Sequence, residues 1–248
     1  MKAYAMTDRG RKRQINQDAV YYSVRPVGNI PNLFVVADGM GGHQAGDFAS
    51  RFTIDHLVSL IEQAEGNNPI TILNDSIRQT NRLLVEKASE DEALYGMGTT
   101  LVAACVLGDV LCVANVGDSR LYLLREGSLR QITRDHSLVE ELIEQGELER
   151  GSAAYHEHKN IITRAIGAGR NVFPDFFEVN LEKGDVAIMC SDGLSNMVED
   201  EKIAQIADGR SDLKGICEDL IEEANRSGGK DNIAVVVFCP SADEVKEW

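Results

Sequence analysis

Four aspartates lie at the ends of apolar runs, where carboxylates could bind a cation. They are Asp38 after LFVVA, Asp118 after VLCVANVG, Asp192 after VAIMCS and Asp231 before NIAVVVF. One aspartate at a strand end is typical of an ordinary turn, but turns alone do not account for four. Carboxylates gathered at one end of a sheet raise each other's pKa unless cations lie between them. Ligands that are all oxygen favour Mg²⁺ or Mn²⁺, so the pattern predicts a metal site.

Glycines adjoin three of these aspartates, at Gly39, Gly117 and Gly193. A residue without a side chain lets backbone carbonyls and waters approach an ion closely. A nucleotide-binding loop is the alternative explanation of the glycine-rich stretch 39–44, GMGGHQ. That stretch lacks the third glycine of GxGxxG, its acid precedes the loop, and no GxxxxGK[ST] motif occurs in the chain. The sequence therefore favours metal binding.

The N-terminal segment adds the pattern Arg13-x-x-Asn16-x-Asp18. An arginine offers a planar fork that fits phosphate oxygens. Metal ions that activate a water, together with an arginine that neutralises the phosphate, are what phosphate-ester hydrolysis requires. A covalent cysteine mechanism is disfavoured, because none of the five cysteines has an arginine six positions further on.

Short apolar runs rich in Val, Leu and Ile predict the strands that must position these groups. The runs span residues 33–37, 100–107, 110–116, 120–125, 185–190 and 232–238. Gly-Asp at 108–109 and Glu-Gly-Ser at 126–128 predict hairpin turns.

Segments with helical spacing of apolar residues lie between the strands. They span residues 44–64, 69–89, 136–145, 200–207 and 212–226. Strand pairs mixed with helix pairs predict an α+β fold in which helices cover sheets. The polar segment 146–170 is weakly periodic, and its first half is expected to be a mobile surface segment. No linker or repeat interrupts the chain, so residues 1–248 are expected to form one domain.

The net charge, the cysteines and the absence of long apolar runs disfavour several classes of protein. The 248 residues carry a formal net charge of −15, which disfavours general nucleic-acid binding. Most of the cysteines lie in apolar, strand-like runs, which predicts buried free thiols in a reducing compartment. The N-terminal stretch MKAYAMTDRGRKRQ contains no apolar core of a signal peptide. No apolar run approaches the ~18 residues that span a bilayer, so we expect a cytoplasmic protein.

Eight motifs, in this order, resemble those of the PPM-type (type 2C) metal-dependent serine/threonine protein phosphatases, most closely the compact bacterial form. They are RKRQINQD (11–18), FVVADGMGGHQAG (34–46), GTTLVAA (98–104), ANVGDSRLYLL (114–124), ITRDHS (132–137), NIITRAIG (160–167), CSDGLSNMV (190–198) and GGKDNIAVVVF (228–238). No single motif is specific to this family, but the occurrence of all eight in this order along essentially the whole chain is highly specific to it.

The resemblance implies an α+β fold with a central β-sandwich of two antiparallel sheets flanked by pairs of helices, in four αββα layers. It also implies two to three Mg²⁺ or Mn²⁺ ions at one end of the sandwich. The implied ligands are Asp38 and the Gly39 carbonyl, Asp192 and Asp231, and, for a third ion, Asp118 with Asp192.

Further roles follow from the same resemblance. Arg13 would be a catalytic residue that binds the substrate phosphate. Asp18 and Asn16 would support the metal ligands and their waters, and Asn232 would help to order the neighbouring Asp231. His43 aligns with the position of the general acid, although it lies three residues further from its Asp-Gly pair than in the animal form.

The implied activity is hydrolysis of phosphoserine and phosphothreonine in proteins by a metal-bridging water, reversing a bacterial Ser/Thr kinase. Segment 146–165 corresponds to the flap, a variable region that faces the substrate. We expect a monomer that acts on phosphorylated proteins and binds neither nucleic acid nor membrane. Two alternatives stay open. One is a catalytically silent regulator, which would lack a metal aspartate or Arg13, and the other is a hydrolase of small phosphate esters.

Overall fold

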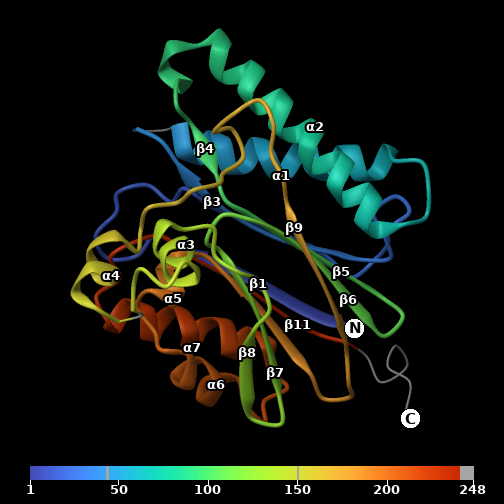
Figure 1. Ribbon diagram of the computed structural model, residues 1–248. Helices are drawn as coiled ribbons and strands as arrows, with labels where there is room; N and C mark the ends of the chain where they lie inside the picture. Colours follow the sequence, from blue (N-terminus) through green and yellow to red (C-terminus); the bar gives the residue numbers. More distant parts are fainter. Residues whose placement is uncertain (43–44, 150, 241–248) are drawn as a thin grey trace.

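Two antiparallel β-sheets lie face to face, with helices on both outer sides (Figure 1). The computed structural model describes residues 1–42, 45–149 and 151–240. This arrangement confirms the predicted β-sandwich with four αββα layers.

The first sheet has the strand order β1-β11-β10-β7-β8. Its strands are β1 (Lys2–Asp8), β11 (Ile233–Cys239), β10 (Val186–Cys190), β7 (Arg120–Arg125) and β8 (Ser128–Gln131). The second sheet has the order β2-β3-β5-β6-β9, and a short strand, β4, pairs with β3. Its strands are β2 (Asp18–Ser23), β3 (Leu33–Met40), β5 (Leu101–Leu107), β6 (Val110–Val116), β9 (Asp175–Asn180) and β4 (Gly98–Thr99).

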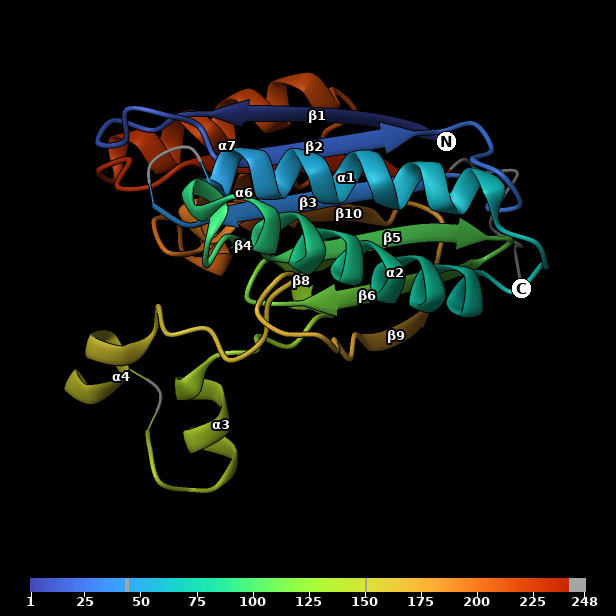
Figure 2. The same cartoon turned by 90° about the horizontal axis from the view of Figure 1, so that it is seen from above.

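Helices form the two outer layers, and two short helices project from the sandwich. The second sheet is covered by α1 (Ala45–Gln63) and α2 (Pro69–Glu90), which is followed by the short η1 (Glu92–Leu94). The first sheet is covered by α5 (Asp192–Ser195), α6 (Asp200–Ala207) and α7 (Leu213–Arg226). Figure 2 shows α3 (Leu138–Glu144) and α4 (Ala153–His158) standing clear of both sheets.

The core has three apolar layers, because both faces of each sheet are covered. Between the sheets, the rings of Phe34 and Phe238 stack with their centroids 3.9 Å apart. Leu57 of α1 and Leu73 of α2 are buried against the second sheet, and Leu220 of α7 is buried against the first. Strands covered on both faces read as continuous apolar runs, which is why the sequence reveals them.

The six predicted strands are confirmed as β3, β5, β6, β7, β10 and β11. Both hairpin turns are confirmed as well, since Leu107 pairs with Val110 and Arg125 pairs with Ser128. Glu126 and Gly127 have φ values of 50° and 75°, as a two-residue turn between twisted strands requires. The apolar pattern of the sequence did not predict β1, β2, β8 and β9, which are the edge strands of the two sheets, or the short β4.

The five predicted helices are confirmed, with ends within two residues of the expected ones. Two short helices, α4 and α5, were not predicted. The first half of segment 146–170, which was expected to be a mobile surface segment, contains α4. The N-terminus of α4 is capped by Ser152, whose side chain accepts a hydrogen bond from the Tyr155 backbone. In the described part of the chain, no helix combines the length and apolar character needed to cross a membrane.

Candidate metal centre

Five aspartates gather at one end of the sandwich. In the second sheet, the register of β2 and β3 places Asp18 directly opposite Asp38. In the first sheet, Asp192 follows β10 and Asp231 precedes the antiparallel β11, so both lie at the same end. Asp118 lies in the turn between β6 and β7. The carboxyl group of Asp38 is within hydrogen-bonding reach of those of Asp18 and Asp192.

The pKa values of these carboxyls are raised, first by burial and then by mutual repulsion. Burial, with the charge of Asp192, raises the pKa of Asp118 to about 8. Burial also raises the pKa of Asp18 to about 7 and that of Asp192 to about 6. The pKa of Asp38 is well above its ordinary value, because burial acts together with the charges of its neighbours. Protons therefore neutralise this cluster when no metal ion does.

The donor set fits a divalent cation. All the side-chain donors are oxygens, which suit hard ions. Among the described residues, nothing donates a hydrogen bond to the buried Oδ1 atoms of Asp18 and Asp118. A buried charged oxygen without a partner is costly, and a cation would satisfy it. Within the described ranges, no three acidic, histidine or cysteine side chains surround one ion position, so backbone carbonyls and waters would have to complete the coordination of a cation.

The metal-free protein is expected to become less stable as the pH rises. The folded carboxyls of Asp192, Asp18 and Asp118 keep their protons up to pKa values of about 6, 7 and 8, whereas the unfolded chain loses them near 3.8. The folded state then binds more protons, so the free energy of unfolding falls between about pH 4 and about pH 8. Each retained proton contributes up to about 1.4 kcal/mol per pH unit. Urea unfolding in the presence of a chelator measures this slope.

The variant Asp18→Asn is the control for that slope, because it removes one titrating carboxyl and should flatten the fall. Added Mg²⁺ or Mn²⁺ should restore stability at high pH, since a ligand that binds only the folded state stabilises it. Equal slopes for the wild type and Asp18→Asn would contradict the assignment of raised pKa values to this cluster.

The backbone of Asp38 is fixed by the GTT motif. Its N–H donates to Thr100 Oγ1 at 2.9 Å. Its carbonyl accepts from the Thr100 N–H and from Thr99 Oγ1, each at 2.9 Å. Thr100 Oγ1 also lies 2.7 Å from Ser119 Oγ, beside Asp118. These bonds hold the two aspartate-bearing segments in fixed relative positions.

Two of the glycines are required by close packing of the backbone. A Cβ atom at Gly39 would lie 2.0 Å from the carbonyl oxygen of Gly46, and one at Gly193 would lie 1.8 Å from that of Asn232. No side chain fits at either position. These glycines were expected to give an ion access to the backbone, and the structure adds this packing requirement.

The side chain of Asn232 forms hydrogen bonds to the loop of residues 9–17. Its Nδ2 donates to the carbonyls of Arg9 and Ile15, each at 2.9 Å. Its Oδ1 accepts from the Gln17 N–H at 2.9 Å. Both polar atoms of the Asn232 side chain are therefore bonded to the backbone of the loop, and these three bonds determine where the loop lies.

Arg13 extends from that loop onto Asp231. Its Nη2 donates to Asp231 Oδ2 at 2.7 Å, and the two side chains are 50% and 36% exposed. The other oxygen of Asp231 accepts from the Asn232 backbone N–H at 2.8 Å. The hydrogen bond to Asp231 raises the pKa of Arg13. Arg13 thus lies beside the carboxylates and stays accessible to a phosphate group.

Hydrogen bonds to neighbouring segments hold the side chains of Asp18 and Asn16 in place. Ser191 Oγ donates to Asp18 Oδ2 at 2.6 Å and accepts from the Ala234 N–H at 2.9 Å. Asn16 Oδ1 accepts from the backbone N–H of Asp18 at 3.1 Å, and its Nδ2 donates to Thr7 Oγ1 at 3.1 Å. Asn16 therefore supports the backbone of Asp18, and among the described residues it makes no hydrogen bond to a carboxylate.

Sequence reasoning assigned no role to Thr99, Thr100 or Asn196. Asn196 Nδ2 donates to Asp192 Oδ2 at 3.0 Å. Asn196 Oδ1 in turn accepts from Lys159 Nζ at 2.8 Å, which links the flap side to the carboxylates. Thr99 and Thr100 lie in the GTT motif and Asn196 lies in the CSDGLSN motif, and these motifs were the sequence signal that could have identified them. His43 lies outside the described residues, so its role as an acid stays a prediction.

Known proteins resemble this chain along nearly its whole length. The family model of protein phosphatase 2C matches residues 28–233. The serine/threonine phosphatase stp of Listeria welshimeri is 40% identical over 243 residues, which cover 96% of this chain and 95% of that protein.

Solved structures share the fold. The crystal structure of the serine/threonine phosphatase Stp1 from Staphylococcus aureus superposes with a TM-score of 0.89 at 34% identity, covering 97% of this chain and 95% of that one. The catalytic domain of the serine/threonine protein phosphatase PstP, solved with two manganese ions, superposes with a TM-score of 0.83 at 36% identity, covering 95% of this chain and 96% of that one. The chain belongs to the protein phosphatase 2C family and is a protein serine/threonine phosphatase.

Proposed function

We propose that this phosphatase hydrolyses phosphoserine and phosphothreonine in proteins with the help of two to three Mg²⁺ or Mn²⁺ ions. The observation that carries the proposal is the convergence of five aspartates from both sheets beside the accessible Arg13. The manganese ions in the related PstP structure support the same class of cation.

The proposed ligands are the carboxylates of this end and one carbonyl: Asp38, Gly39, Asp192 and Asp231 for two ions, and Asp118 with Asp192 for a third. Bound there, divalent cations supply an activated water and neutralise the charge of the phosphate. Asp18, held by Ser191, would accept hydrogen bonds from waters bound to the ions.

Arg13 binds the phosphate of the substrate. Its guanidinium would exchange the Asp231 carboxylate for a phosphate oxygen of the substrate. The departing serine or threonine oxygen is a poor leaving group and needs a proton as the P–O bond breaks. We propose His43 as the donor of that proton, as the family resemblance implies.

Loss of Arg13 is expected to weaken substrate binding. In Arg13→Ala, the KM for phosphoserine and phosphothreonine peptides should rise about 10- to 100-fold, the worth of a charge-assisted hydrogen bond. Arg13→Lys should be intermediate, because a lysine keeps the charge but not the fork. Steady-state kinetics measures KM, and calorimetry should find Mn²⁺ affinity little changed.

The same assay separates the alternatives. The wild type should prefer phosphopeptides to nucleoside monophosphates and sugar phosphates in kcat/KM. A preference for the small esters would support a small-ester hydrolase, and no turnover of any substrate would support a silent regulator. An unchanged KM in Arg13→Ala would remove Arg13 from the phosphate site.

The proposed setting is the cytoplasm, where the enzyme acts as a monomeric single-domain phosphatase and reverses a Ser/Thr kinase. Support comes from the cysteines, which are free and, apart from the partly buried Cys239, buried. Such thiols suit a reducing compartment.

A further inference from the structure

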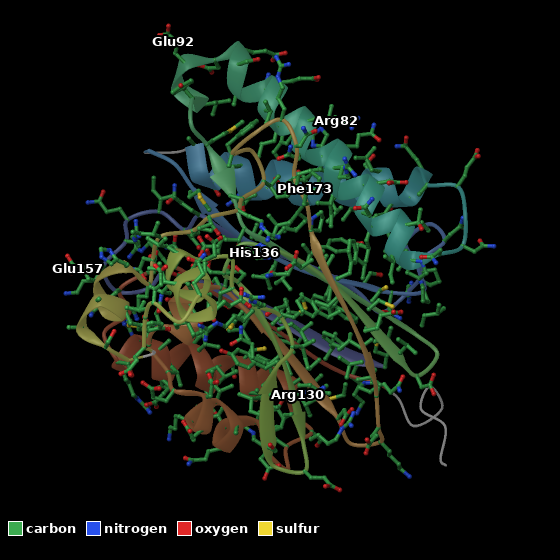
Figure 3. All side chains as sticks on the ribbon, in the orientation of Figure 1. Arg82, Glu92, Arg130, His136, Glu157 and Phe173 are labelled. Atoms are coloured by element: carbon green, nitrogen blue, oxygen red, sulfur yellow. The ribbon has the colours of Figure 1, made fainter. Side chains whose placement is uncertain are left out.

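A basic surface stands out on this acidic chain. Arg78 and Arg82 of α2 lie beside Arg170 and Phe173 of the loop that leads into β9; we call these four residues the arginine patch. Arg82 and Arg170 are exposed, and the Phe173 side chain is 63% exposed. Figure 3 labels Arg82 and Phe173 in this region, on the α2 side of the molecule. The chain as a whole carries a net charge of −15, so a local excess of arginine needs an explanation.

The patch is built rigidly from the buried side chain of Asn81. Asn81 Oδ1 accepts from the Gly167 N–H at 2.8 Å. Asn81 Nδ2 donates to the carbonyl of Gly169 at 2.8 Å and to that of Arg170 at 3.3 Å. These bonds hold the loop on α2 and determine the position of Arg170 relative to the helix.

Phe173 is also fixed, although it is exposed. The guanidinium of Arg78 lies 5.6 Å from the centroid of its ring, within the range of a cation–π contact. Arg164 Nη1 donates to the Phe173 carbonyl at 3.3 Å and to Asp175 at 2.7 Å. A rigid, exposed aromatic ring beside arginines is typical of protein interfaces.

The charges of the patch are not balanced within the described structure. Arg120, Arg125 and Arg164 all make ion pairs with aspartates. In the described ranges, no ion pair involves Arg78, Arg82 or Arg170, and Glu86, four residues after Arg82, makes none with it. Arg78 and Arg82 are themselves four residues apart, so their like charges lie on the same helical face and repel. An acidic partner would remove that repulsion.

The loop of the patch is connected to the metal centre. It continues directly from the flap, and Figure 1 shows it passing α2 before it enters β9. Ile166, at the start of the loop, pairs with Thr99 through two backbone hydrogen bonds of 2.9 and 3.0 Å. Thr99 Oγ1 donates to the carbonyl of Asp38. A protein bound at the metal centre can therefore extend along the flap onto the patch.

We propose that the arginine patch docks an acidic segment of the phosphoprotein substrate, outside the phosphorylated residue itself. Arg82 and Arg170 pair with carboxylates of that segment, and Phe173 packs on an apolar side chain within it. This inference rests on the proposed function, since it names a class of substrate for the same site. Exposed charge pairs act mainly on encounter and specificity, so the patch selects substrates and leaves the chemical step unchanged.

The test uses two phosphothreonine peptides of equal length, one with an Asp/Glu tract and one with Asn/Gln in its place. The full-length wild type with Mn²⁺ should show a KM about three- to tenfold lower for the acidic peptide. The double variant Arg82→Ser/Arg170→Ser should raise that KM to the value of the neutral peptide. The KM of the neutral peptide, kcat for both peptides and p-nitrophenyl phosphate turnover should not change.

Arg130→Ser is the matched control. It removes an exposed arginine on β8, which Figure 3 labels far from Arg82. It should leave both KM values unchanged. Raising the salt from about 0.05 M to about 0.5 M should abolish the wild-type preference, because salt screens exposed charges. Phe173→Ser should raise the KM of the acidic peptide without abolishing its salt dependence.

Several results would overturn the docking role. One is an unchanged KM for the acidic peptide in the double variant, and another is an equal rise in Arg130→Ser. Inhibition by a DNA oligonucleotide as strong as that by the unphosphorylated acidic peptide would instead show a general polyanion surface. Failure of the proposed function is distinguishable, because the wild type would then hydrolyse neither peptide.

Discussion

Replacing Asp38 by asparagine is expected to abolish phosphopeptide hydrolysis, with kcat/KM falling by at least about 10³-fold. The Asp38 carboxyl lies within reach of Asp18 in its own sheet and of Asp192 from the other sheet. Asparagine keeps the shape of the side chain but loses its charge, so it would be a weaker ligand for the proposed cations. Several kcal/mol of charge stabilisation are then lost, and each 1.36 kcal/mol is tenfold in rate.

Calorimetry with Mn²⁺ supplies a readout that does not depend on turnover. Asp38→Asn should lose tight binding, whereas Asp118→Asn should keep two tight sites and more of the activity. Unfolding in chelator checks the fold of the variant. Metal-free Asp38→Asn should melt at a higher temperature than the wild type at neutral pH, because asparagine is neutral without a proton, whereas the buried Asp38 carboxyl must either keep a proton or carry a charge among like charges. Near-normal activity with tight Mn²⁺ binding in Asp38→Asn would refute the assignment of this residue.

Removal of divalent cations is expected to lower activity to the uncatalysed background. Without cations, the acidic end of the sandwich repels a phosphate dianion. Arg13 is then paired with Asp231 at 2.7 Å, so it offsets less of the repulsion. The activated water that phosphate hydrolysis needs is lost together with the ions.

Dialysis against a chelator, followed by stepwise return of Mn²⁺ or Mg²⁺, measures this dependence. Activity should return in proportion to the occupancy of the tight sites found by calorimetry. The Arg82→Ser/Arg170→Ser variant is a suitable control, because its cation dependence should equal that of the wild type. Full activity in excess chelator would contradict a metal mechanism in this chain.

The strands that could be predicted from the sequence are the interior ones. β3, β5, β6, β7, β10 and β11 have neighbours on both sides and covered faces, so their residues form unbroken apolar runs. The edge strands leave one side without a neighbour and consist mainly of half-buried and exposed residues, as DFFEVN does in β9. Such mixed sequences do not differ clearly from loops.

The sequence by itself determined the residue types of the site. The aspartates stand where apolar runs stop, and Asp-Gly and GTT motifs mark those ends. Their chemistry, all-oxygen donors with one arginine, follows from composition and spacing alone. Even the polar residues without an assigned role, such as Thr100 and Asn196, lie inside motifs that the sequence made visible.

Only the tertiary structure decided which of these residues meet. Arg13 pairs with Asp231 across 218 positions, and Ser191 bonds Asp18 across 173 positions. Local spacing cannot specify such contacts, because they depend on strand register, on the order of strands and on how the two sheets pack. The register that places Asp18 opposite Asp38, and the hold of Asn81 on the loop of the arginine patch, arise from that packing. The order of residues along the chain determined which chemical groups are available, and the packing of the folded backbone determined where those groups lie.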